Sequence, residues 1–262
     1  MSSKLRRVTI ANRLLNSGEA SIAELAQTFG TSEMTIRRDL ELLEIEGLAL
    51  RVRGGAISTQ SRSYQTPIMQ RATLESEAKQ RIGEAAAELL VPGETAIIDG
   101  GTTTLQMAKA INPGLGLTII TSSLLIASEL DTKPEISVMV TGGKLRHGEM
   151  SLVGSRAEGS FDGLNCDSVF IGAAGLSEEK GLTEYNLEDT EIKLAAIKSS
   201  RRVVVLADAS KMGQVTFVNV APLHEIDLIV TNAAPTNRTI QVARELGVEI
   251  LHVEPIAHES VA

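Results

Sequence analysis

The stretch that decides the fold of the N-terminal part runs from residue 21 to residue 55 and reads SIAELAQTFGTSEMTIRRDLELLEIEGLALRVRGG. Ser21 and Glu24 form a capping-box pattern, and apolar residues follow at helical spacing, which predicts a short helix. After one tight turn, Ser32 is a suitable N-cap for a second helix, which Gly47 ends. Two short helices joined by a tight turn are typical of a helix-turn-helix.

The residues on either side complete this motif. Apolar positions recur at intervals of three and four from Leu5 to Leu15, which predicts a preceding helix. On the other side, Leu48–Arg53 alternates apolar and basic residues, Gly54-Gly55 supplies a turn, and Ala56–Ser58 offers a return strand. Residues 1–58 therefore read as a winged helix-turn-helix.

The helix after the turn is the one that enters the major groove, with its N-terminal turns nearest the bases. Arginines in these turns and in the wing can bind guanine or phosphate. A simpler interpretation is that Arg37 and Arg38 form surface ion pairs with Glu41 at helical spacing. The candidate DNA-binding residues are Ser32, Thr35, Arg37, Arg38, Arg51 and Arg53.

A family resemblance rests on these same residues. The run SEMTIRRDL from Ser32 to Leu40, followed by Gly47 and by RVRGGA from Arg51 to Ala56, resembles the DNA-binding signature of the DeoR family of bacterial regulators. The resemblance covers nearly all of residues 4–58. It implies binding to a specific operator, usually as a repressor.

Charge is distributed unevenly along the 262 residues. The formal net charge is −8, whereas residues 1–62 hold nine Lys and Arg against seven Asp and Glu. A small DNA-reading part attached to an acidic body fits this distribution, since only the surface that faces phosphates must be positive. Hydrophobic residues make up 43% of the chain, enough for a substantial core, which excludes disorder as the main state.

The remainder of the chain reads as a second, larger domain. Polar residues from Ser58 to Pro67 predict an exposed connection, and we expect the domain borders at 1–58, 59–75 for the linker and 76–255. Apolar runs then alternate with helical patterns, which predicts an α/β domain with a doubly wound, mostly parallel sheet. The strands are expected at 95–98, 117–120, 136–140, 168–171, 203–206 and 228–230, and the helices at 74–90, 103–111, 123–130, 188–199 and 239–246.

The residues that follow these strands are rich in glycine and hydroxyl groups. Ligands of such sheets bind beyond the carboxyl ends of the strands, where glycines let backbone amides approach an anion. Each loop alone fits ordinary helix capping, but together they predict a site for a small phosphorylated ligand. The candidate residues are Asp99, Gly101, Thr102, Thr103, Thr104, Thr121, Ser122, Ser123, Gly142, Gly143, Gly172, Asp208 and Lys211.

Residues 76–250 resemble the effector domain of the DeoR family, which is similar in fold to ribose-5-phosphate isomerase. The resemblance implies a phosphorylated sugar as effector and adds Gly181 and Glu188 to the site, and no sequence pattern calls for a cofactor. The isomerases carry D-G-A-D where this chain has Gly172-Ala173-Ala174-Gly175, so we expect binding without catalysis. Asp99 and Glu188 stay open as bases, and an isomerase with a DNA-binding tether remains an alternative.

Other chemistries lack their sequence patterns. Neither G-x-G-x-x-G after the first strand nor a phosphate-binding P-loop is present. Cys166 is the only cysteine and the four histidines show no ligand spacing, so we expect no metal site. No apolar run is long enough for a signal peptide or a membrane span, and we expect a cytoplasmic protein.

These patterns together predict a DNA-binding transcription regulator. The resemblance implies a repressor of a sugar or polyol catabolic operon, controlled by a phosphorylated sugar. We expect a homodimer or homotetramer, since one small module contacts too few base pairs for useful specificity. A scaffold protein that binds DNA without a ligand is the second alternative, and it would show little sequence preference.

Overall fold

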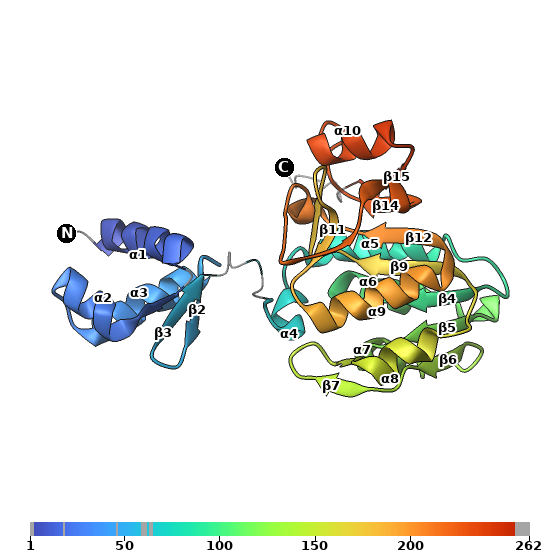
Figure 1. The fold of residues 1–262 in the computed structure, drawn as a ribbon, viewed down its shortest axis with the longest axis horizontal. Helices are drawn as coiled ribbons and strands as arrows, with labels where there is room; N and C mark the ends of the chain where they lie inside the picture. Colours follow the sequence, from blue (N-terminus) through green and yellow to red (C-terminus); the bar gives the residue numbers. More distant parts are fainter. Residues whose placement is uncertain (1–2, 18, 46, 59–61, 63–64, 255–262) are drawn as a thin grey trace, which may run out of the picture. The chain divides into compact units, whose positions relative to one another are not determined.

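The structure is a computed structural model that describes residues 3–17, 19–45, 47–58, 62 and 65–254. The chain divides into two compact units, Met1–Thr66 and Pro67–Ala262. Figure 1 labels most of the helices and strands of each unit.

The described residues of the N-terminal unit form three helices and a three-stranded antiparallel sheet of order β1-β3-β2. The predicted winged helix-turn-helix is confirmed, with β2 and β3 as the wing. Strand β1 was not predicted, because three residues carry no periodic signal. The elements are α1 Ser3–Ser17, β1 Glu19–Ser21, α2 Ile22–Phe29, α3 Glu33–Ile45, β2 Ala49–Val52 and β3 Gly55–Ser58.

Local contacts explain where α2 begins and ends. The Ser21 hydroxyl accepts a hydrogen bond from the Glu24 amide at 3.1 Å, as the capping-box pattern predicts. Gly30 ends the helix with a φ of 58°, a left-handed conformation that favours glycine. The apolar stripes of the three helices share one buried core, which includes Ile10, Leu14, Leu25, Ile36, Leu40 and Leu43.

The C-terminal unit is built on a seven-stranded sheet in which every neighbouring pair is parallel. Its order is β15-β14-β12-β9-β4-β5-β6. All six predicted strands are present, and β15 is an addition, because its residues EILH lack a continuous apolar run. The strands are β4 Thr95–Ile98, β5 Thr118–Thr121, β6 Ser137–Val140, β9 Cys166–Gly172, β12 Ser200–Leu206, β14 Leu228–Thr231 and β15 Glu249–His252.

Helices cover both faces of this sheet (Figure 1), so the doubly wound architecture is confirmed. Successive strand residues point to opposite faces. Val169 and Ile171 therefore pack in one core with α9 and α10, whereas Phe170 packs in the other with α5, α6 and α7. The helices are α5 Ser76–Ala87, α6 Thr102–Ala110, α7 Leu124–Leu130, α9 Leu187–Lys198 and α10 Arg238–Glu245.

Smaller elements surround the main sheet. The short helix α4 lies within the range 59–75 that was expected as a linker. Strands β7 and β8 form a hairpin, and β10, β11 and β13 form a separate antiparallel sheet. These elements are α4 Ile68–Arg71, β7 Lys144–Arg146, β8 Ser151–Val153, α8 Ser155–Glu158, β10 Gly175–Ser177, β11 Gly181–Glu184 and β13 Val218–Ala221, with 3-10 turns at Pro113–Leu115, Gly159–Phe161, Ala209–Lys211 and Leu223–Glu225.

The strand order indicates where along the sheet a ligand is expected to bind. From β4 the chain adds β5 and β6 on one side, and then β9, β12, β14 and β15 on the other. The order therefore reverses between β4 and β9. In open α/β sheets, the crevice beyond the carboxyl ends of the strands at such a reversal is the usual binding site.

Candidate functional site

Asp99 and Gly172 meet at the reversal point. Asp99 follows β4 and Gly172 ends β9, and the Gly172 amide donates to Asp99 Oδ2 at 3.2 Å. Asp99 is buried, at 8% exposed. Two of the loops that were predicted to form the site are thus joined by a direct hydrogen bond.

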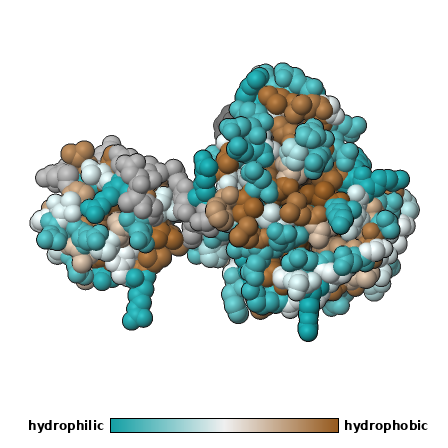
Figure 2. Space-filling view, viewed as in Figure 1, coloured by the Kyte–Doolittle hydropathy of each residue, from teal (hydrophilic) through white to brown (hydrophobic). Residues whose placement is uncertain are grey.

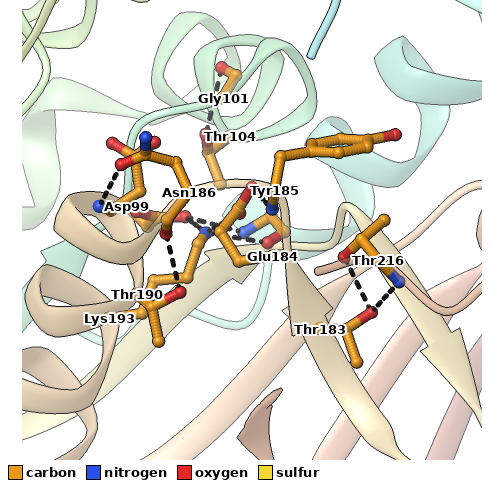
Figure 3. A network of polar contacts seen from close by, with 12 residues as sticks. Asp99, Gly101, Thr104, Thr183, Glu184, Tyr185, Asn186, Thr190, Lys193 and Thr216 are labelled. Carbon is orange, nitrogen blue, oxygen red and sulfur yellow. Dashed lines mark hydrogen bonds and ion pairs between the residues drawn. The ribbon is translucent and has the colours of Figure 1, made fainter. Parts of the chain in front are cut away.

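A buried lysine completes a charged cluster with two carboxylates (Figure 3). Lys193 Nζ donates to Asp99 and to the Gly172 carbonyl at 3.0 Å, and it lies 3.4 Å from Glu184 Oε2. The side chain of Lys193 is 4% exposed, that of Asp99 is 8% exposed and that of Glu184 is 6% exposed. We call these three residues the charged cluster. It places one cation between two carboxylates where the carboxyl ends of β4 and β9 meet.

The charge of the cluster follows from its surroundings. Burial acts to lower the pKa of Lys193, but the charges of Asp99 and Glu184 outweigh burial and hold that pKa above its ordinary value. Burial raises the pKa of the Asp99 carboxyl, and the Lys193 charge opposes the rise. Lys193 therefore stays protonated between the two acids.

The N-terminus of α6 opens beside this cluster. Gly101 occupies the N-cap position without a side chain that could bond the first helical amides. Thr102, Thr103 and Thr104 form the first turn and are buried, and the Thr104 hydroxyl donates to the Gly101 carbonyl at 3.1 Å. Free amides and the helix dipole make this end of α6 suitable for an anion.

Three serines lie next to the same loop. A Cβ added at Gly100 would lie 3.6 Å from the Ser123 Cβ and 3.7 Å from the Ser151 Cβ. Ser122, which precedes Ser123, is also buried, and its carbonyl accepts from the Leu152 amide at 2.8 Å. Ser123 caps α7 by accepting from the Ile126 amide at 3.3 Å. The Ser151 hydroxyl is buried and has no hydrogen-bond partner among the described residues. Such a group is costly unless a ligand or water bonds it.

Some predicted residues have structural tasks. The Thr121 hydroxyl donates to the Ile98 carbonyl at 2.6 Å and accepts from the Ser123 amide at 3.1 Å. Gly143 has a φ of 119°, and a Cβ there would lie 2.6 Å from the Val153 carbonyl oxygen. The neighbouring Gly142 is exposed, and its amide donates to Ser160 Oγ at 3.1 Å. Thr121 and Gly143 thus shape the loops.

The structure does not bring Gly181 and Glu188 to the charged cluster. Gly181 is at the far end of β11 from Glu184, and a Cβ there would lie 2.2 Å from the Ala221 carbonyl oxygen. The Glu188 side chain is 43% exposed and pairs with Lys144 at 2.6 Å. The carboxylate in the cluster is Glu184, four residues earlier, because β11 ends there and turns its last side chain inward.

Asp208 and Lys211 lie at the end of β12. Asp208 Oδ1 accepts from the Ser210 amide at 2.9 Å, while its Oδ2 is buried without a partner among the described residues. Lys211 is half-buried. Lys79, which was not predicted, is near this pair: burial lowers the pKa of Lys79 to about 8, and the charge of Asp208 opposes this.

Ion pairs tie the β7–β8 hairpin to two helices. Arg146 pairs with Asp189 in the first turn of α9, and Arg71 of α4 pairs with Glu149 in the hairpin turn. Burial raises the pKa of Glu149 and of Asp189 to about 6, and the arginines oppose the rise. The hairpin also carries Ser151, which lies near Gly100, so it connects this loop to α4 near the start of the C-terminal unit.

Lys193 and Glu184 are the site residues that sequence reasoning missed. Lys193 has the spacing of a buried residue, three positions after Thr190 and three before Ala196, both of which are buried. A lysine on a buried stripe indicates a buried ion pair. Its partner Asp99 lies 94 residues away, and no local pattern connects the two.

In the N-terminal unit, the predicted DNA-binding residues gather on the first turns of α3 and on the wing. The Ser32 and Thr35 hydroxyls are 3.0 Å apart and bond each other at the helix start. Arg37 and Arg38 are exposed, and Arg37 lies 3.5 Å from Glu33, so the ion pair of Arg37 is with this residue and not with Glu41.

The two wing arginines differ in their contacts. Arg51 Nε donates to Glu44 Oε2 at 2.7 Å, and Glu44 raises the pKa of the Arg51 guanidinium. Arg53 is exposed in the turn between β2 and β3. Arg51 is therefore oriented by α3, whereas Arg53 projects from the tip of the wing.

Two segments of the sequence match the parts of one family. Residues 6–62 match the DeoR-like helix-turn-helix domain, and residues 74–233 match the DeoR C terminal sensor domain. The chain belongs to the DeoR family. This DeoR-family protein is a DNA-binding transcriptional regulator with a sensor domain.

Curated relatives of the DeoR-family chain are named as regulators. The HTH-type transcriptional repressor GlcR of Bacillus subtilis is 33% identical over 249 residues, which are 95% of this chain and 96% of the relative. The glycerol-3-phosphate regulon repressor of Escherichia coli is 32% identical over 233 residues, 89% and 92% of the two chains. A putative aga operon transcriptional repressor of Escherichia coli O157:H7 is 28% identical over 250 residues, 95% and 93%.

Solved structures similar to this one include ribose 5-phosphate isomerase A from Methanocaldococcus jannaschii, at 18% identity over 53% of this chain and 55% of that chain, with a TM-score of 0.38. The probable sor operon regulator from Shigella flexneri is 12% identical over 64% and 88% of the two chains, with a TM-score of 0.43. No functional conclusion follows from values this low.

Within the described residues, no helix is long and apolar enough to cross a membrane, and no group of acids, histidines and cysteines is arranged to hold a metal ion.

Proposed function

We propose that this DeoR-family regulator represses a sugar or polyol catabolic operon in the cytoplasm and that a phosphorylated sugar bound in the crevice controls its grip on the operator. The observation that carries the proposal is the buried, unpartnered Ser151 hydroxyl beside the open N-terminus of α6. A phosphate oxygen supplies the acceptor that this hydroxyl lacks, and the α6 amides supply further donors.

The charged cluster suits the sugar end of such a ligand. The carboxylate oxygens of Asp99 and Glu184 accept hydrogen bonds from sugar hydroxyls, and the Lys193 ammonium donates to them. All three groups are held in place before a ligand arrives, which lowers the entropy cost of binding. Phosphate and sugar are thus recognised by neighbouring but chemically different parts of the crevice.

The cluster supports binding better than catalysis. A general base must be free to take up a proton, whereas both acids already face one protonated lysine. The relatives named above are also regulators rather than enzymes. We therefore propose no catalytic residue.

On the DNA side, we propose that Arg37, Arg38, Arg51 and Arg53 contact the operator, with the Ser32–Thr35 pair fixing the start of the recognition helix.

Two copies of this small module are needed for useful specificity, which supports a homodimer or homotetramer. Figure 2 shows brown hydrophobic patches among teal ones on the visible face of the C-terminal unit. Exposed apolar side chains of this unit include Met139, Val140, Leu187, Leu194 and Phe217.

The β7–β8 hairpin offers a route from the crevice to the operator. Ser151 of β8 lies against the Gly100 loop, and the Arg71–Glu149 pair joins the hairpin to α4. A ligand that moves Ser151 therefore moves the segment from which the chain continues to the N-terminal unit. Such coupling requires that the ligand favour one hairpin position over another.

The affinity of the Ser151→Ala variant for sugar phosphates, compared with that of the wild type, tests this proposal. We expect one sugar phosphate of a panel to bind the wild type in calorimetry, and the variant to bind it about tenfold or more weakly, because a hydrogen bond to a charged group contributes about 1.5–3 kcal/mol. The free variant should unfold at the wild-type temperature or slightly above it, because the hydroxyl has no partner to lose and its burial is costly.

Ser155→Ala is the matched control, because this exposed serine lies only four residues further along the chain. It should bind the ligand as the wild type does. Equal affinity of wild type and Ser151→Ala, or a panel in which nothing binds, contradicts the proposed site.

A further inference from the structure

Met34 is an exposed apolar residue at the start of the recognition helix. Its side chain is 75% exposed in the first turn of α3, two residues after the helix-opening Ser32. Every apolar residue of α3 that packs in the core lies elsewhere on the helix, at Ile36, Leu40 and Leu43. A partner that covers this side chain would remove its apolar surface from water.

The helical spacing places Met34 at the centre of the outward face. Successive residues turn by about 100°, so Met34 lies about 160° to 200° away from Ile36 and Leu43. Arg38, one turn further on, shares its side of the helix, and Arg37 flanks it. In a helix that enters the groove by its N-terminal turns, Met34 lies on the face expected to meet the base edges.

Its polar neighbours are already engaged. Ser32 and Thr35 bond each other at 3.0 Å, and Glu33 lies 3.5 Å from Arg37. An apolar side chain in the major groove has one natural counterpart, the C5 methyl of thymine. We propose that Met34 reads a thymine methyl in each operator half-site and so contributes to sequence specificity.

The inference rests on operator binding as the function of this chain. Methionine suits the contact, because its flexible thioether adapts to a methyl group whose position varies with DNA shape. The arginines on either side hold the helix to guanine or phosphate and leave the methyl contact to Met34. No other exposed apolar residue of the described part of α3 lies in its first two turns.

A uracil scan tests the inference with the full-length protein. The operator is first selected from random DNA, and each thymine is then replaced singly by uracil, which removes only the methyl group. At fixed salt, uracil at one position per half-site should weaken wild-type binding about fourfold, the amount expected for one buried methyl group. Met34→Ala should bind thymine and uracil at that position equally.

Ile45→Ala is the matched control, since Ile45 lies on the same outward face, is 77% exposed and sits at the far end of α3. It should keep the wild-type uracil profile. The inference is overturned if Met34→Ala retains the fourfold dependence, or if no uracil affects the wild type. If the wild type enriches no preferred sequence from the random DNA, sequence-specific binding itself is contradicted. This outcome is distinct from a failure of the Met34 contact, in which an operator is still selected.

Discussion

Replacing Lys193 with methionine lowers the free energy of unfolding of the C-terminal unit by about 3 to 5 kcal/mol, the usual cost of breaking a buried ion pair from one side. The variant leaves Asp99 and Glu184 at 8% and 6% exposed without their cation. Methionine fills a similar volume, so the loss reports charge rather than a cavity. Urea unfolding followed by circular dichroism measures it.

Two further variants make this expectation specific. Lys198→Met, in the last turn of the same helix and exposed, should unfold as the wild type does. Adding Asp99→Asn to Lys193→Met should recover part of the lost stability, because it removes one of the two unpaired charges. A Lys193→Met protein with the wild-type midpoint contradicts the charged cluster.

Replacing Asp39 with alanine should abolish operator binding while the sensor unit keeps its ligand. Asp39 lies in the recognition helix but points inward, and its Oδ2 is 2.5 Å from Arg6 Nε of α1. The Asp39 side chain is 5% exposed and that of Arg6 is 14% exposed, so the change leaves a nearly buried guanidinium without its carboxylate. The cost of about 3 kcal/mol is a large part of the stability of so small a unit.

Glu24→Gln provides the matched control in this unit. Glu24 pairs with Arg13 at 3.5 Å on the surface, where such pairs contribute less than about 1 kcal/mol. Anisotropy on operator DNA and calorimetry with the ligand are measured on each variant. Normal operator affinity of Asp39→Ala shows that the Arg6 pair does not hold α3 in place.

The elements that the sequence predicted are those with local signals. The stripe and caps of the helix-turn-helix lie within a few residues of one another, as the Ser21–Glu24 bond illustrates. The strands of the large sheet are buried on both faces and appear as apolar runs. Strand β15 was not predicted because Glu249 and His252 interrupt its apolar run at the edge of the sheet.

The candidate site was predicted only in part, for a physical reason. Asp99 and the α6 loop have a local pattern of glycines and hydroxyls, which marks them in the sequence. Lys193 and Glu184 become site residues only when α9 and β11 fold against β4, and a single sequence carries no signal for that contact. Glu188 was predicted from the family resemblance, and in the structure its side chain pairs with Lys144, whereas Glu184 at the end of β11 lies beside Lys193.

The measurement that tests the central claim most directly is fluorescence anisotropy of the full-length protein on DNA from upstream of its own gene. The DNA is titrated at fixed salt, with and without saturating amounts of the sugar phosphate that binds the wild type. The account predicts a change in operator Kd of about tenfold, or about 1.4 kcal/mol of coupling, that is lost in Ser151→Ala at the same ligand concentration. An operator affinity that no sugar phosphate alters would contradict it.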